Sequence, residues 1–153
     1  MWSVFEHGGK AIDEVFEKYG LTERKEIALQ IYRLQQPDIS FYEGVEGMLA
    51  RIQKSRKVGI ITDGRPEGQR AKIDALGLKA DRIIITDELG GIGYHKPNPT
   101  AFQMMQRFFD VPFHRMMYVG DNQQKDFAAP DQPGMKSVWF RNPDEIYTKR
   151  VGE

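Results

Sequence analysis

The 153-residue sequence contains no cysteine, which excludes disulfide bonds, zinc sites built on thiolates and a cysteine nucleophile. It has no net charge either, because 22 lysine and arginine residues balance 22 aspartate and glutamate residues. The basic excess typical of proteins that bind nucleic acids or acidic membranes is therefore missing. No apolar run is long enough to span a bilayer, and the first residues do not form an apolar signal stretch. These absences predict a soluble, cytoplasmic protein with no nucleic-acid or membrane partner.

The composition is that of one globular domain with a core of ordinary size. Hydrophobic residues make up 40% of the sequence and charged residues 29%. Up to residue 43 the apolar side chains recur at helical spacing, in particular over residues 12–19 and 27–34. The pattern changes at Gly44, where strands begin to alternate with helices. We therefore expect a helical region at residues 1–43 and a sheet-containing core at residues 44–153.

Four short apolar segments after Gly44 read as strands separated by helices. The strands are predicted at residues 58–62, 82–85, 116–119 and 137–140, and the helices at residues 45–52, 67–76, 102–109 and 125–129. This alternation is typical of an open, mostly parallel sheet with helices on both faces, so the predicted fold class is α/β and Rossmann-like. The first strand shows no polar alternation, which predicts burial on both of its faces.

Polar side chains follow the carboxyl ends of the predicted strands, where ligands bind in open α/β sheets. Thr62-Asp63-Gly64 ends the first strand, Gly120-Asp121 ends the third, and Lys96 lies in the loop after the second. Thr62 and the backbone N–H groups after it suit phosphate oxygens, and the glycine permits their close approach. Lys96 supplies a compact positive charge, and the carboxylate of Asp121 suits Mg²⁺. The pattern indicates a site for a phosphate ester.

Each of these residues also has an ordinary structural interpretation. Thr62 can form a turn, and Lys96 can be a solvated loop residue. Asp121 and Asp126 can cap the next helix or place negative charge in its first turn. The three histidines show no metal-ligand spacing, and His95, beside Lys96, is more simply a loop residue than a substrate contact. The order of the polar residues along the chain, rather than any one of them, favours a shared site.

Three segments taken together resemble the haloacid dehalogenase (HAD) superfamily. Residues 60–64, residues 96–102, and residues 118–122 with Asp126 look like its second, third and fourth motifs. The residues before Gly44 look like part of the small α-helical cap of its phosphatase-like subfamily. The resemblance implies a Mg²⁺-dependent phosphatase that works through an aspartyl-phosphate, with a small phosphorylated metabolite as its substrate.

The resemblance also implies a role for each motif residue. Thr62 binds the transferring phosphoryl group, in a substrate-binding set with Asp63, Gly64 and Lys96. Lys96 offsets the charge of the nucleophile and the phosphate, Asp121 ligates Mg²⁺, and Asp126 orients Lys96 or a metal-bound water. Thr62, Lys96 and Asp126 are thus expected to be catalytic, which agrees with the positioning and charge neutralisation that phosphoryl transfer requires.

The sequence departs from the family at the first motif. There the family carries its nucleophile, in a strand that ends in Asp-x-Asp, and this sequence contains no Asp-x-Asp. We therefore expect a truncated chain that begins inside the cap, binds Mg²⁺ weakly and is inactive by itself. In the family the absent strand lies between the strands that end at Thr62 and Val119. These strands must pair directly, recruit a strand from another copy or an upstream segment, or pack loosely, and the first two are favoured.

Several alternatives stay open at this stage. The main one is a non-catalytic HAD-like module that binds phosphate or a protein partner. An unrelated doubly wound binding domain is a second, and dehalogenase or phosphonatase chemistry is a third. The identity of the substrate and the oligomeric state are not determined by these motifs.

Overall fold

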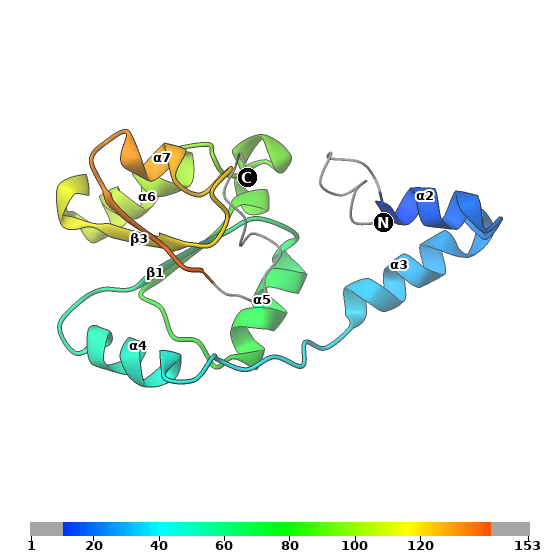
Figure 1. Ribbon diagram of the computed structural model, residues 1–153, viewed down its shortest axis with the longest axis horizontal. Coiled ribbons are helices and arrows are strands. Elements are labelled where there is room, and N and C mark those ends of the chain that lie inside the picture. The colour runs from blue at the N-terminus through cyan, green and yellow to red at the C-terminus, as the bar shows by residue number, and fades with distance from the viewer. Residues whose placement is uncertain (1–10, 142–153) are drawn as a thin grey trace. The chain divides into compact units, whose positions relative to one another are not determined.

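The computed structural model describes residues 11–141, and the chain divides into two units (Figure 1). The division lies between Pro37 and Asp38, whereas the sequence predicts a boundary at Gly44. Residues 1–10 of the predicted helical region and residues 142–153 of the predicted core lie outside the described residues. Among the described residues, no helix is both long enough and apolar enough to cross a membrane.

The described part of the first unit, residues 11–37, contains helices, as its sequence predicts. They are α2 (Ala11–Lys18), the single 3-10 turn η1 (Thr22–Arg24) and α3 (Lys25–Leu34). Gly20 follows α2 with a left-handed φ of 65°, and its N–H donates to the carbonyl oxygen of Glu17 at 3.1 Å. Glycine ends helices in this way because it has no Cβ to resist the left-handed conformation. An ion pair of 2.8 Å between Lys25 and Asp13 joins the two helices.

The second unit alternates strands and helices in the predicted order. These elements are α4 (Val45–Gln53), β1 (Gly59–Thr62), α5 (Pro66–Ala75), β2 (Arg82–Ile85), α6 (Thr100–Phe109), β3 (Met117–Gly120), α7 (Ala128–Asp131) and β4 (Lys136–Trp139). Single 3-10 turns lie between them at η2 (Thr86–Leu89), η3 (Ile92–Tyr94) and η4 (Phe113–Arg115). The helix predicted at residues 125–129 begins later, because Asn122 holds a turn there. Its side-chain Oδ1 accepts the N–H of Gln124 at 3.0 Å, and its carbonyl oxygen accepts the N–H of Asp126 at 2.9 Å.

The strands form two separate parallel pairs. β1 pairs with β2, so that Ile61 lies opposite Ile84, and β3 pairs with β4, so that Val119 lies opposite Val138. The α/β class with parallel strands is confirmed. Direct pairing of β1 with β3 is wrong for the described residues, where no ladder joins the two pairs. Recruitment of a strand from another chain or segment stays a prediction.

β1 is less buried than the sequence predicts, and β3 is also partly exposed. In β1, Gly59 is exposed and residues 60–62 are half-buried. In β3, Met117 is 63% exposed and Val119 is 56% exposed. Each described strand has a hydrogen-bonded neighbour on one side only, so it lacks the cover that a central strand receives from both sides.

The core lies along α6. Ala101, Phe102 and Met105 are each 3% exposed or less. Met105 packs in one cluster with Ile84 of β2, whereas the ring of Phe102 meets the ring of Tyr118 in β3 edge-on, with 5.0 Å between the ring centroids. α6 therefore contacts both strand pairs and holds them together.

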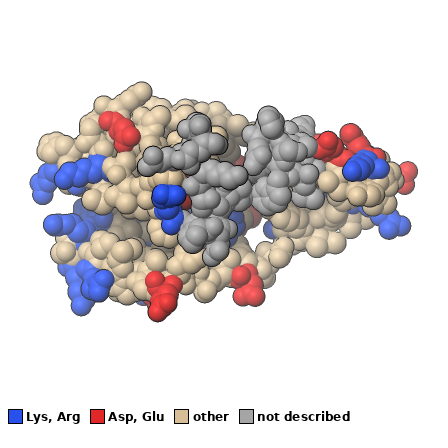
Figure 2. Space-filling model, in the orientation of Figure 1, with Lys and Arg blue, Asp and Glu red and all other residues tan. Residues whose placement is uncertain are grey.

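Cations cover the aromatic residues at the end of α6. Lys57 Nζ lies 5.9 Å from the ring centroid of Phe109, and the guanidinium of Arg82 lies 5.2 Å from that of Phe108. In Figure 2, lysine and arginine side chains gather on the left of the view, which is the side where α6 ends. The charges of this neutral chain are therefore unevenly distributed on that face, and the cations shield partly exposed aromatic rings.

Candidate functional site

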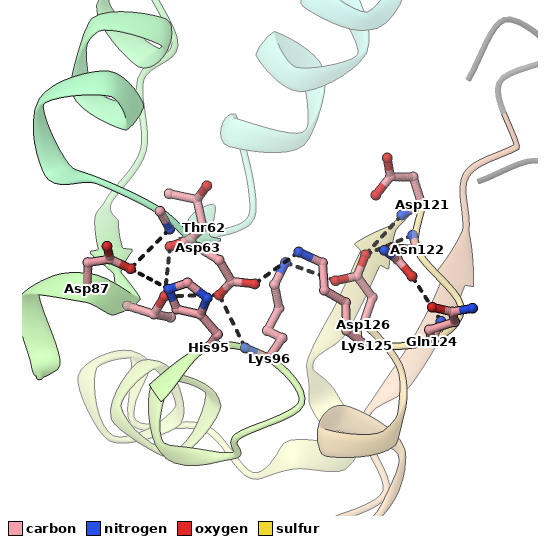
Figure 3. Close-up of polar contacts among 12 residues, drawn as sticks. Thr62, Asp63, Asp87, His95, Lys96, Asp121, Asn122, Gln124, Lys125 and Asp126 are labelled. Atoms are coloured by element: carbon pink, nitrogen blue, oxygen red, sulfur yellow. Dashed lines mark hydrogen bonds and ion pairs between the residues drawn. The ribbon is translucent and has the colours of Figure 1, made fainter. Parts of the chain in front are cut away.

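The Asp63 carboxylate joins several segments just beyond β1. Its Oδ1 accepts the Thr86 hydroxyl at 3.0 Å and the backbone N–H of Lys96 at 3.2 Å, and its Oδ2 lies 3.2 Å from Lys125 Nζ (Figure 3). Burial acts to raise the pKa of Asp63, but the Lys96 charge and these hydrogen bonds outweigh it, so the pKa is lowered. Asp63 is therefore ionised at neutral pH and ties β1 to the loop after β2 and to the turn after β3.

Lys96 places a buried positive charge in the same region. Its ammonium lies 2.9 Å from Asp126 Oδ1 and donates to the Tyr118 hydroxyl at 3.1 Å. The Lys96 side chain is 9% exposed and that of Asp126 only 2%. Burial acts to lower the pKa of Lys96, but the oxygens of Tyr118 and Asp126 stabilise the ammonium, and the pKa is raised. Burial, together with the charge of Asp126, raises the pKa of Tyr118 to about 12, so the phenol is neutral at physiological pH.

The turn after β3 positions Asp126. Its Oδ2 accepts the backbone N–H groups of Asp121 at 3.2 Å and Asn122 at 3.0 Å. A Cβ at Gly120 would lie 2.6 Å from that oxygen, so a side chain at this position would displace the carboxylate. Both oxygens of Asp126 thus accept hydrogen bonds or an ion pair from the chain. This geometry suits the orientation of Lys96 better than the direct binding of a metal.

Asp121 lies beyond the end of β3. Its N–H donates to Asp126, and its carbonyl oxygen accepts the indole N–H of Trp139 at 2.9 Å, so two elements fix its backbone. Within residues 11–141, no three acidic or histidine side chains are grouped to hold a metal ion. Mg²⁺ commonly binds one or two protein carboxylates and keeps several waters. Among the described residues, a Mg²⁺ ion bound at Asp121 would therefore take most of its ligands from water.

The hydrogen-bonding groups of the turn after β1 already have partners within the chain. The Thr62 hydroxyl donates to Oε1 of Gln69 at 2.9 Å. The N–H of Gly64 donates to Oδ1 of Asp87 at 3.2 Å, and the same carboxylate oxygen contacts Nε2 of His95. Gly64 has a φ of 119°, a conformation that residues with a side chain rarely adopt. Binding of a phosphate by this turn therefore requires an exchange of hydrogen-bond partners.

The structure links five of the predicted site residues, Thr62, Asp63, Lys96, Asp121 and Asp126, into one network, whereas Gly64 donates to Asp87. The Asp63 carboxylate contacts the backbone N–H of Lys96, and the Asp126 carboxylate contacts both the Lys96 ammonium and the backbone N–H of Asp121. Thr62 is joined to this network through its carbonyl oxygen, which accepts the same Thr86 hydroxyl that donates to Asp63. In Figure 3, Thr62 and Asp63 lie on one side of Lys96, and Asp126 and Asp121 lie on the other.

Further residues of the network are not among the site residues that the sequence predicts, in particular Tyr118, Lys125 and Gln69. Tyr118 is an apolar-looking member of β3, and only its position beside Lys96 reveals the role of its hydroxyl. Lys125 meets Asp63 across 62 positions of sequence, which no local pattern predicts. Gln69 could have been found from its spacing, since a residue in the first turn of the helix after a strand is close to that strand's end.

The lowered pKa of Asp63 predicts how stability depends on pH. A group with a lowered pKa stabilises the fold above its unfolded pKa, about 3.9 for aspartate, and this contribution is lost as the pH falls through the folded pKa. The difference in unfolding free energy between the wild type and Asp63→Asn is therefore expected to be constant from about pH 7 to 5 and to shrink below about pH 4. Urea unfolding of both proteins at each pH measures this difference in unfolding free energy.

Asp74→Asn is the matched control, because Asp74 lies exposed on α5. Its unfolding free energy is expected to stay within about 0.5 kcal/mol of the wild type at every pH. A wild-type advantage over Asp63→Asn that is unchanged between about pH 5 and 3 would contradict the pairing of Asp63 with Lys96 and Lys125.

Comparison with known proteins gives relatives for most of the chain. Residues 4–140 match the family described as haloacid dehalogenase-like hydrolase. The chain is 34% identical over 101 residues to a glyceraldehyde 3-phosphate phosphatase of Pyrococcus abyssi, an alignment that covers 64% of this chain and 41% of that protein. It is 27% identical over 100 residues to a pyrimidine 5'-nucleotidase of Escherichia coli, an alignment that covers 63% of this chain and 43% of that protein. The chain spans about two fifths of the length of these relatives.

Solved structures share the fold. A haloacid dehalogenase-like hydrolase of Xanthomonas campestris has a TM-score of 0.67 at 20% identity, over 93% of this chain and 60% of that one. A HAD hydrolase of Bacillus subtilis, described as bound to magnesium, has a TM-score of 0.69 at 20% identity, over 99% of this chain and 69% of that one. The family match extends over nearly all of residues 11–141 and includes all three motifs. The chain therefore belongs to the haloacid dehalogenase-like hydrolase family.

Proposed function

We propose that this site binds the phosphate group of a small phosphorylated metabolite. The reaction that such binding supports is the Mg²⁺-dependent cleavage of phosphate monoesters. The observation that carries the proposal is the buried ammonium of Lys96, which Asp126 and Tyr118 hold in place, while the backbone N–H of the same residue donates to Asp63 in the turn after β1. The name of the Pyrococcus relative, a glyceraldehyde 3-phosphate phosphatase, supports the phosphatase assignment.

Phosphoryl transfer depends mainly on positioning and on neutralising charge, and the site offers groups for both tasks. Lys96 neutralises negative charge on the phosphate, and Asp126 keeps its ammonium in place. The Thr62 hydroxyl donates a hydrogen bond to a phosphate oxygen once it no longer donates to Oε1 of Gln69. Asp121 would hold Mg²⁺, which supplies further positive charge to the phosphate oxygens when it is bound.

Three carboxylates near the strand ends, those of Asp63, Asp87 and Asp126, are poorly suited to act as the nucleophile, and Asp121 is assigned to Mg²⁺. Asp63 accepts hydrogen bonds on both oxygens, as does Asp126, and Asp87 is engaged by Gly64 and His95. The sequence also lacks the Asp-x-Asp motif in which the family carries its nucleophile. We propose that this chain by itself binds phosphate without hydrolysing phosphate esters, as a non-catalytic phosphate-binding module also would.

Phosphate binding tests the proposed role of Lys96. The double variant Lys96→Met with Asp126→Asn removes the cation without leaving a buried carboxylate unpaired. Calorimetry with inorganic phosphate in the presence of Mg²⁺ is expected to show binding by the wild type and binding at least about tenfold weaker by the double variant, because a charged hydrogen bond is lost.

The matched control is Lys72→Met with Asp74→Asn, which makes the same two changes at exposed positions of α5. Its phosphate affinity should equal that of the wild type. A wild type that binds no phosphate, or a Lys96 and Asp126 variant that binds it as tightly as the control does, would contradict the proposed function.

Turnover tests the assignment of the nucleophile. The purified chain is expected to hydrolyse p-nitrophenyl phosphate in Mg²⁺ no faster than the Lys96 and Asp126 double variant does, because Asp63, Asp87 and Asp126 are engaged within the chain and Asp121 is assigned to Mg²⁺. Release of p-nitrophenol is followed by absorbance. Clear turnover by the wild type that disappears in the double variant would show that a nucleophile is present.

A further inference from the structure

Gln69 reaches from α5 back to the end of β1. Its Oε1 accepts the Thr62 hydroxyl at 2.9 Å, and its Nε2 lies 3.0 Å from the point that a Cβ on Gly64 would occupy. The amide of Gln69 therefore lies directly on the turn that follows β1. The absence of a side chain at Gly64 leaves the space that the amide occupies.

The backbone under Gln69 is well fixed. Pro66 begins α5, and the N–H of Gln69 donates to the carbonyl oxygen of Arg65 at 3.0 Å, so the residue belongs to the first turn of the helix. The side chain is half-buried. Because the backbone is already fixed, only side-chain rotation is left to be ordered when the amide orients a neighbouring hydroxyl.

The direction of the Thr62 hydroxyl proton decides whether Thr62 can bind phosphate. A hydroxyl has one proton to donate, and the oxygens of a phosphate dianion only accept hydrogen bonds. In the structure the proton of Thr62 points to Oε1 of Gln69, so it is not directed at an anion. A half turn of the amide about its last bond would place Nε2, a donor, where Oε1 lies now.

We infer that Gln69 is a positioning residue for phosphate binding. When phosphate binds, the amide of Gln69 donates an N–H to Thr62 Oγ1, and this directs the Thr62 hydroxyl proton at a phosphate oxygen. Without phosphate, the amide oxygen accepts that proton and keeps the hydroxyl satisfied. The inference rests on the proposed function and adds to it a residue that acts only through Thr62.

The test measures the affinity for inorganic phosphate, in Mg²⁺ and by calorimetry, in four proteins of a double-mutant cycle. Gln69→Met keeps the length of the side chain and removes its polar ends, so the affinity is expected to fall about 2- to 10-fold. In the presence of Thr62→Val the same substitution is expected to change the affinity by less than about twofold, because the proton that Gln69 directs is absent.

A second variant tests the polarity of the amide. Gln69→Glu has nearly the same shape but can only accept from Thr62, so it keeps the proton away from the phosphate and adds a negative charge. Its phosphate affinity is expected to fall at least about tenfold. Gln103→Glu, which adds the same charge at an exposed position of α6, is the matched control and should bind phosphate as the wild type does.

The outcomes separate this inference from the proposed function. Equal losses from Gln69→Met with and without Thr62→Val, or no loss in either case, would overturn the inference, provided that the Lys96 and Asp126 double variant has lost binding. A wild type that binds no phosphate would overturn the proposed function and the inference with it. Thermal unfolding of each variant confirms that it is folded. If Gln69→Met is not folded, Gln69→Ala replaces it in the cycle.

Discussion

The ion pair between Lys96 and Asp126 is the constraint on which the rest of the site depends. The pair measures 2.9 Å and is almost entirely shielded from water. Buried charges are tolerated only when further hydrogen bonds replace the lost hydration, and here Tyr118 and the backbone N–H groups of Asp121 and Asn122 provide them. The pair joins the loop after β2 to the turn after β3, so the same interaction that satisfies the charges also brings the two strand pairs together at their carboxyl ends.

A second ion pair and the packing of α6 support that connection. Asp63 meets Lys125 across the same boundary at 3.2 Å, and α6 packs on β2 through Met105 and on β3 through Phe102. The strand pairs are thus held by side chains and not by a shared hydrogen-bonded ladder. Their arrangement follows from where charged groups find partners, which links the stability of the fold to the geometry proposed for phosphate binding.

The order of the elements and the family could be predicted from the sequence, because apolar periodicity and the residues at strand ends are local signals. Thr62, Lys96 and Asp121 were selected on that basis. What could not be predicted depends on tertiary contacts. The separation of β1 from β3 and the exposure of Val119 follow from which strands find a neighbour, and the contact of Gln69 with Thr62 depends on how α5 leaves the sheet.

The central claim is that Lys96 is a buried lysine with a raised pKa that receives phosphate, and NMR of the ¹⁵N-labelled lysine side chains tests it most directly. The ordinary pKa of a lysine side chain is about 10.4, whereas the raised pKa of Lys96 predicts that its ammonium signal persists above that pH. At neutral pH the same signal should shift as inorganic phosphate is added. A Lys96 ammonium that titrates with the exposed lysines, or one that does not respond to phosphate, would contradict the account.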